Sequence, residues 1–138
     1  MGQRVLVCGG RHYDKRDLLY AVLDFVHLTT RPVDCVIHGD ATGADSLAKA
    51  WAELHNVLLE PYPAAWDDLS ARPLILRYRP NGTPYNAAAG FIRNQRMLVE
   101  GRPNLALAFA GGKGTADMVE RVERANRYGA DILLAKFP

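Results

Sequence analysis

The chain has 138 residues, of which 49% are hydrophobic and 23% are charged, and its formal net charge is +2. These values fit a single globular domain over residues 1–138. They exclude a membrane-spanning protein, because no apolar run approaches the roughly 20 residues that a bilayer requires. The N-terminus also lacks the pattern of a signal peptide, so we expect a cytoplasmic protein without a membrane partner.

The two cysteines, Cys8 and Cys35, both lie inside apolar, strand-like runs. Buried free thiols are expected there, which suits the reducing environment of the cytoplasm. Neither the cysteines nor the four histidines have a spacing typical of metal ligands. The sequence therefore predicts no metal site.

Positive charge is concentrated in one stretch of the chain. Residues 69–99 contain five arginines and no Asp or Glu, so this segment carries +5 and the remainder carries −3. Such a segment is either an ordinary solvated surface or a surface that meets phosphate or another anion.

Apolar periodicity predicts strands and helices that alternate along the chain. In chain order we expect a strand at 4–8, a helix at 14–28, a strand at 33–38, a helix at 44–55, a strand at 57–62, a helix at 86–100, a strand at 105–110, a helix at 115–128 and a strand at 131–135. This alternation predicts a Rossmann-like α/β fold, a three-layer α/β/α sandwich around a five-stranded parallel sheet of order 3-2-1-4-5. Ligands bind such sheets at the carboxyl ends of the strands, where the order of connections reverses.

A long irregular loop is expected at about 63–84, because four prolines interrupt any helical or strand period there. Loops of this length form a lid or a binding loop, or else are disordered insertions. Three aromatic residues lie in or beside the loop, and they either stack on a base or pack the loop onto the body. They are Trp66, Tyr78 and Tyr85.

Three predicted strands end in glycine-rich turns, at 9–11, 39–43 and 111–115. Glycine allows close approach of a ligand, and a helix that starts after such a turn presents unpaired N–H groups and a partial positive charge. Because the three turns follow parallel strands, they should meet at one edge of the sheet as a phosphate site. Their spacing matches neither the dinucleotide fingerprint nor the Walker A loop, so a nucleotide-like ligand is expected but no NAD or ATP cofactor.

Four motifs in this order resemble the SLOG superfamily, and most of all its small YspA/YpsA-related branch of bacteria and phages. The motifs are VLVCGGR at 5–11, VIHG through GAD at 36–45, GFIRNQRM at 90–97 and GGKGT at 111–115. The resemblance extends over about residues 4–135. It implies a Rossmann-like domain that binds nucleotides or nucleotide-derived ligands, and its relatives include LOG-type phosphoribohydrolases, DNA-processing proteins that bind single strands, and nucleotide sensors.

The same resemblance implies where catalysis would reside. LOG-type enzymes hold phosphate with a Pro-Gly-Gly-x-Gly-Thr-x-x-Glu motif. The glutamate of this motif is catalytic, and an arginine from a helix completes the site. In this chain Ala110 replaces the proline, Met118 stands in place of the glutamate, and Arg93 matches the arginine. Because glycosidic cleavage needs a carboxylate, Asp45 at the start of the second predicted helix could supply it instead, and Asp40 and Asp117 are further candidates. The catalytic candidates retained are Asp45, Arg93 and Asp117. The two aspartates are otherwise first-turn carboxylates that the helix dipole favours.

Arginines near these turns are candidates to neutralise a phosphate. Arg93 and Arg96 are three residues apart on one helix face, so they either grip a phosphate together or pair with carboxylates. Arg11 directly follows the first glycine pair. The predicted ligand-binding residues are Gly9, Gly10, Arg11, Gly39, Gly43, Arg93, Asn94, Arg96, Gly111, Gly112, Lys113, Gly114 and Thr115.

The sequence thus predicts a protein that binds a nucleotide-derived phosphate ligand, as a sensor or a nucleotide-processing protein. Three alternatives remain at this point: cleavage of the N-glycosidic bond of nucleoside monophosphates, binding of single-stranded nucleic acid, and an inert scaffold that oligomerises through the helix at 86–100. Whether the protein is an enzyme is left open, because Met118 replaces the LOG-type glutamate. By resemblance to related folds, a homodimer is expected.

Overall fold

The computed structural model describes residues 2–138. Within them the chain forms seven strands and four helices. In chain order the elements are β1 (Gln3–Cys8), α1 (Arg16–Thr29), β2 (Val33–His38), α2 (Ala44–Leu54), β3 (Leu58–Pro61), β4 (Leu76–Tyr78), β5 (Pro84–Asn86), α3 (Ala89–Val99), β6 (Leu105–Phe109), α4 (Lys113–Arg127) and β7 (Leu133–Phe137). In this described range, no helix combines the length and the apolar character needed to cross a membrane.

Five strands form one sheet in the order β3-β2-β1-β6-β7, and every neighbouring pair in it is parallel. The α/β, Rossmann-like class is therefore confirmed. The expected order 3-2-1-4-5 differs in its numbering, because two short strands that the sequence analysis missed precede the last two strands of the sheet. The strand expected at 105–110 is β6, and the one expected at 131–135 is β7.

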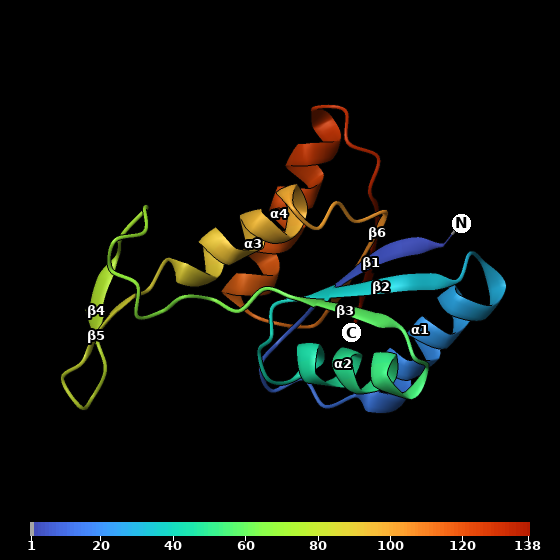
Figure 1. Ribbon diagram of the computed structural model, residues 1–138, viewed down its shortest axis with the longest axis horizontal. Coiled ribbons are helices and arrows are strands. Elements are labelled where there is room, and N and C mark those ends of the chain that lie inside the picture. The colour runs from blue at the N-terminus through green and yellow to red at the C-terminus, as the bar shows by residue number, and fades with distance from the viewer. Residues whose placement is uncertain (1) are drawn as a thin grey trace.

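Helices cover both faces of the sheet, α1 and α2 on one side and α3 and α4 on the other (Figure 1). Alternate residues of β1 serve the two sides, since Val5 and Val7 pack with Leu19 and Trp51, whereas Leu6 packs with Met97 and Met118. The strands are therefore apolar on both faces, which explains why they are nearly continuous apolar runs in the sequence.

The segment expected to be irregular contains an antiparallel hairpin, in which β4 pairs with β5. The segment is therefore not irregular throughout, and the sequence missed the hairpin because two strands of three residues each leave almost no periodic signal. The hairpin projects beyond the carboxyl ends of the sheet strands, next to the start of α3 (Figure 1). Because β5 ends at Asn86, helix α3 begins at Ala89 rather than at Asn86 as expected.

Candidate functional site

The three glycine-rich turns meet at the carboxyl edge of the sheet, where they line one cavity of about 400 Å³. The first turn contributes Gly9, Gly10 and Arg11, the second Gly39 and the third Gly112 to Thr115. The strands before these turns, β2, β1 and β6, are neighbours in the sheet. The switch point between β1 and β6 therefore lies at the cavity, as expected for this fold.

Direct hydrogen bonds hold the three turns together. The amide of Gly10 donates to the carbonyl oxygen of Ala110 over 3.0 Å, and the amide of Ala44 donates to the carbonyl oxygen of Gly10 over 3.2 Å. The hydroxyl of Thr42 donates to the carbonyl oxygen of Arg11 over 3.0 Å. The turns are thus built as one unit before any ligand arrives.

Two of the predicted ligand residues serve this packing instead of facing the cavity. Gly43 has a φ of +75°, and a Cβ there would overlap the carbonyl oxygen of Gly10. A Cβ on Gly111 would overlap the hydroxyl of Thr115. Neither glycine lines the cavity, so we correct both predicted contacts: these glycines allow the turns to approach one another.

The cavity wall formed by the start of α4 has free space beside two of its glycines. A Cβ built on Gly112 or on Gly114 has no atom within 4 Å, although both residues line the cavity. Helix α4 begins at Lys113, and its first backbone bond runs from the amide of Ala116 to the carbonyl oxygen of Gly112. The amides that precede Ala116 have no acceptor within the helix, and the helix dipole adds partial positive charge there. Thr115 lies in the first turn and does not cap the helix, whose N-cap is Gly112.

Positive charge prevails around the cavity. Arg11, Arg93 and Lys113 line it, and in the described part of the chain Asp45 is its single carboxylate. Burial lowers the pKa of Arg93, an effect that Asp45 opposes and the nearby charge of Arg11 strengthens. An anion bound in the cavity would offset the positive charges of both Arg11 and Arg93.

Asp45 is only 6% exposed and belongs to the first turn of α2. Its Oδ2 atom accepts hydrogen bonds from the amides of Gly39, over 3.1 Å, and Ala41, over 3.3 Å. Burial raises the pKa of this carboxyl to about 6, although the Ala41 amide and the Arg93 charge act in the opposite direction. The side chain therefore titrates near neutral pH, as a general acid or base requires.

Arg93 reaches from α3 to the end of β2. Its Nη1 donates to the carbonyl oxygen of Gly39 over 2.6 Å, and its Nε donates to Oδ1 of Asn94 over 3.1 Å. A Cβ on Gly39 would overlap this guanidinium, so the absence of a side chain at Gly39 admits Arg93 to the site.

Arg96 lies elsewhere, which corrects the expected pair of arginines on one phosphate. It forms an ion pair with Glu100 in the same helix, with Nε and Oε2 2.8 Å apart, and its guanidinium lies over the ring of Tyr62. It does not line the cavity of the glycine turns. Residues three apart share a broad helix face, but Arg93 turns toward β2 whereas Arg96 turns toward the end of α3.

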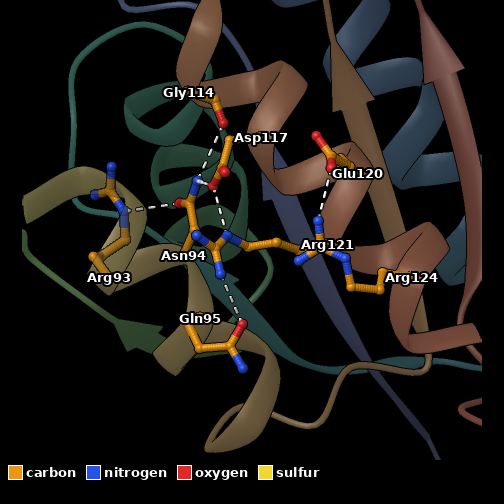
Figure 2. Close-up of polar contacts among 8 residues, drawn as sticks. All are labelled: Arg93, Asn94, Gln95, Gly114, Asp117, Glu120, Arg121 and Arg124. Atoms are coloured by element: carbon orange, nitrogen blue, oxygen red, sulfur yellow. Dashed lines mark hydrogen bonds and ion pairs between the residues drawn. The ribbon is translucent and has the colours of Figure 1, made fainter. Parts of the chain in front are cut away.

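Asn94 is 5% exposed and joins α3 to α4 (Figure 2). Its amide donates to the carbonyl oxygen of Gly114 over 3.1 Å and to Oδ2 of Asp117 over 3.0 Å. Asp117 also accepts from Nε of Arg121 over 2.7 Å, and Arg121 in turn donates to Gln95. Asp117 is therefore held in a network between two helices and does not line the cavity, which argues against its predicted catalytic role.

Met118, which stands where LOG-type enzymes have glutamate, is 1% exposed in the core beneath α4. The neighbouring acidic residue Glu120 points to solvent and pairs with Arg124 (Figure 2). No carboxylate of α4 lines the cavity in the part of the chain that the structure describes.

Several residues that line the cavity were not predicted from the sequence. These residues are Val7, Cys8, Ala41, Ala87, Gly90, Phe91 and Met97. Most of these are apolar, and their spacing in the sequence suits core residues equally well. Burial raises the pKa of the Cys8 thiol to about 12, which disfavours the reactive thiolate. No group of metal-binding side chains occurs within residues 2–138.

Comparison with known protein families identifies a match in the first half of the chain. Residues 3–68 match the model of the YAcAr family, described as the YspA, cpYpsA-related SLOG family. No curated protein and no solved structure matches the chain. The matched region contains the first two motifs and the turns that follow β1 and β2, and it confirms the resemblance that the sequence indicated.

Proposed function

We propose that this protein, whose residues 3–68 match the YspA, cpYpsA-related SLOG family, binds a nucleotide through its phosphate at the carboxyl edge of the sheet. The phosphate would lie against the amides of Gly112 to Thr115, with Arg11, Arg93 and Lys113 supplying positive charge. The protein then acts as a nucleotide sensor or as a nucleotide-processing protein. Its unpaired thiols, Cys8 and Cys35, suit the cytoplasm.

One observation carries this proposal: three turns from three adjacent strands line one cavity that is open at the start of a 15-residue helix. Helix starts of this kind bind phosphate through free amides and the dipole. The cavity volume, about 400 Å³, lies within the range of pockets that hold small ligands. The apolar residues on the other walls, among them Phe91 and Met97, suit the base or the sugar.

Calorimetry with a matched pair of ligands tests the proposal. Each of the four common nucleoside 5′-monophosphates is titrated into the protein, and the parent nucleoside serves as the control. We expect binding of at least one monophosphate that weakens by about tenfold or more when the phosphate is removed. Equal affinity for nucleoside and nucleotide would contradict a phosphate site.

A second candidate function rests on Asp45, the buried carboxylate in the cavity wall. In a hydrolysis of the N-glycosidic bond, Asp45 would accept a proton from a water molecule whose oxygen bonds to the sugar C1′ atom. The bond from C1′ to the base breaks, and the base takes up a proton from solvent as it leaves. A pKa of about 6 leaves this carboxylate mostly ionised at pH 7, as a base requires.

Chromatography distinguishes a sensor from a hydrolase. Release of free base from a bound monophosphate, lost in Asp45→Asn, supports the enzyme. Binding without release of base by the wild-type protein supports the sensor.

A further inference from the structure

A second cavity, of about 440 Å³, adjoins the first on the side of the hairpin. Three residues line both cavities, namely Arg11, Trp66 and Ala87. The remaining walls of the second cavity come from β4, β5 and the turn between them, with Tyr78, Arg79, Pro80 and Tyr85. The two cavities are therefore two parts of one groove that passes Trp66.

The second cavity carries aromatic and cationic groups. Three aromatic rings and two guanidinium groups line it, and the guanidinium of Arg79 is already paired with Asp67, with Nη2 and Oδ1 2.8 Å apart. The guanidinium of Arg79 lies 5.1 Å from the ring centre of Tyr85, and that of Arg11 lies 5.3 Å from the ring centre of Trp66. Tyr78 is 64% exposed, so most of its ring is free for contact. Aromatic rings beside arginines are the combination that stacks nucleobases and neutralises phosphates.

The hairpin is fixed in place relative to the first cavity. Asn86, at the end of β5, is fully buried and its Oδ1 accepts from the amides of Ile75 and Ala88, while its Nδ2 donates to the carbonyl oxygen of Pro73. Its backbone amide donates to the carbonyl oxygen of Trp66 over 2.8 Å. The same residue thus positions both the hairpin and the ring shared by the two cavities, so the groove exists without a ligand.

From this groove we propose a second nucleobase subsite on the hairpin, formed by Trp66, Tyr78 and Tyr85, so that the protein takes a 5′-phosphorylated dinucleotide rather than a mononucleotide. The inference rests on the proposed function, since the terminal phosphate occupies the turn at Gly112. The first nucleoside fills the first cavity, and the second base stacks in the second. Arg11, which lines both cavities, lies where the linking phosphodiester must pass.

Calorimetry tests the subsite by comparing adenosine 5′-monophosphate with 5′-phosphorylated diadenylate. The same pair of ligands is compared for each of the other three bases. We expect one dinucleotide to bind about tenfold more tightly than its mononucleotide, the effect of one added base stack. Tyr78→Ala should remove this gain and leave mononucleotide affinity unchanged. Tyr128→Ala, an exposed tyrosine that lines neither cavity, is the matched control and should change neither affinity.

The outcomes separate the two proposals. Equal affinity for dinucleotide and mononucleotide, or a Tyr78→Ala variant that keeps the gain, would overturn the subsite and leave the proposed function intact. Failure of every mononucleotide and dinucleotide to bind would overturn both. A 5′-phosphorylated decanucleotide is the last probe. If its affinity equals that of the dinucleotide, the result supports a small ligand. A steep further rise in affinity would overturn the dinucleotide proposal in favour of single-stranded nucleic acid.

Discussion

The Nη1 atom of Arg93 donates a hydrogen bond of 2.6 Å to the carbonyl oxygen of Gly39, and this bond joins α3 to the end of β2. The same guanidinium lines the cavity and attracts Asp45, whose Oδ2 accepts from the amide of Gly39. One arginine therefore both closes the second glycine turn and supplies positive charge to the site.

Replacement of this arginine should weaken nucleotide binding. Arg93→Ala removes a charged donor, and we expect affinity for a bound monophosphate to fall by about 10- to 100-fold. Arg93→Lys keeps the charge but loses the planar guanidinium fork, so its affinity should lie between those of the wild type and Arg93→Ala. Arg96→Ala is the matched control, because this residue lies on the same helix outside the cavity. A loss in Arg96→Ala as large as in Arg93→Ala, measured by calorimetry, would contradict this assignment.

The buried carboxyl of Asp45 predicts a pH dependence of stability. Its folded pKa, about 6, lies above the value of 3.8 for an exposed aspartate, so ionisation in the folded state opposes folding. The penalty is absent below about pH 4, grows as the pH rises toward 6 and is complete above it. The difference in pKa corresponds to about 3 kcal/mol at most.

Asp45→Asn should therefore raise the free energy of unfolding at pH 7.5 relative to the wild type, with the difference vanishing near pH 4. Urea denaturation at both pH values checks this, and Asp117→Asn, altered on another helix, is the comparison. A variant that is less stable than the wild type at pH 7.5 would contradict the raised pKa.

Two glycines of the turns should respond in opposite ways to the same substitution. Gly43→Ala places a Cβ against the carbonyl oxygen of Gly10 at a φ of +75°, and the backbone strain alone costs about 1–3 kcal/mol. Gly112→Ala meets no atom within 4 Å, so the fold should keep its stability while the new methyl group obstructs the phosphate. Thermal denaturation and calorimetry together test the pair. Unchanged nucleotide binding in Gly112→Ala would contradict the placement of the phosphate.

Asp117 should prove structural. Asp117→Asn weakens the ion pair with Arg121, whose Nε lies 2.7 Å from the Asp117 carboxylate, and should lower the free energy of unfolding by about 1 kcal/mol. Nucleotide affinity, and release of base if the protein is a hydrolase, should stay within about twofold of the wild type. Glu120→Gln, which weakens a solvent-exposed pair on the same helix, is the control for stability. Loss of base release in Asp117→Asn alone would restore its catalytic role.

The sequence predicted the sheet, its helices and the meeting of the three turns because these features depend on periodicity and on parallel topology. Continuous apolar runs identify strands such as β6, and glycine at a strand end is visible in the sequence. Which glycine faces the cavity and which one packs is decided by contacts between turns distant in the sequence. Gly43 against Gly10 is such a contact.

The hairpin and the direction of the arginines required three-dimensional information. Strands β4 and β5 have three residues each, which is too short for a period to emerge. The hairpin depends on the burial of Asn86. This burial cannot be predicted from the residue type, since asparagine is usually exposed. Helical spacing placed Arg93 and Arg96 on one face, but Glu100 determines where Arg96 turns.

The central claim is that three turns form one phosphate site, and amide chemical shifts recorded by NMR during titration with a nucleoside monophosphate test it most directly. We predict that the amides of Gly10, Gly39 and Gly112 shift together and saturate at one ligand concentration, whereas amides at the exposed end of α1 remain unchanged. Shifts confined to one turn, or turns that saturate at different concentrations, would contradict a common site.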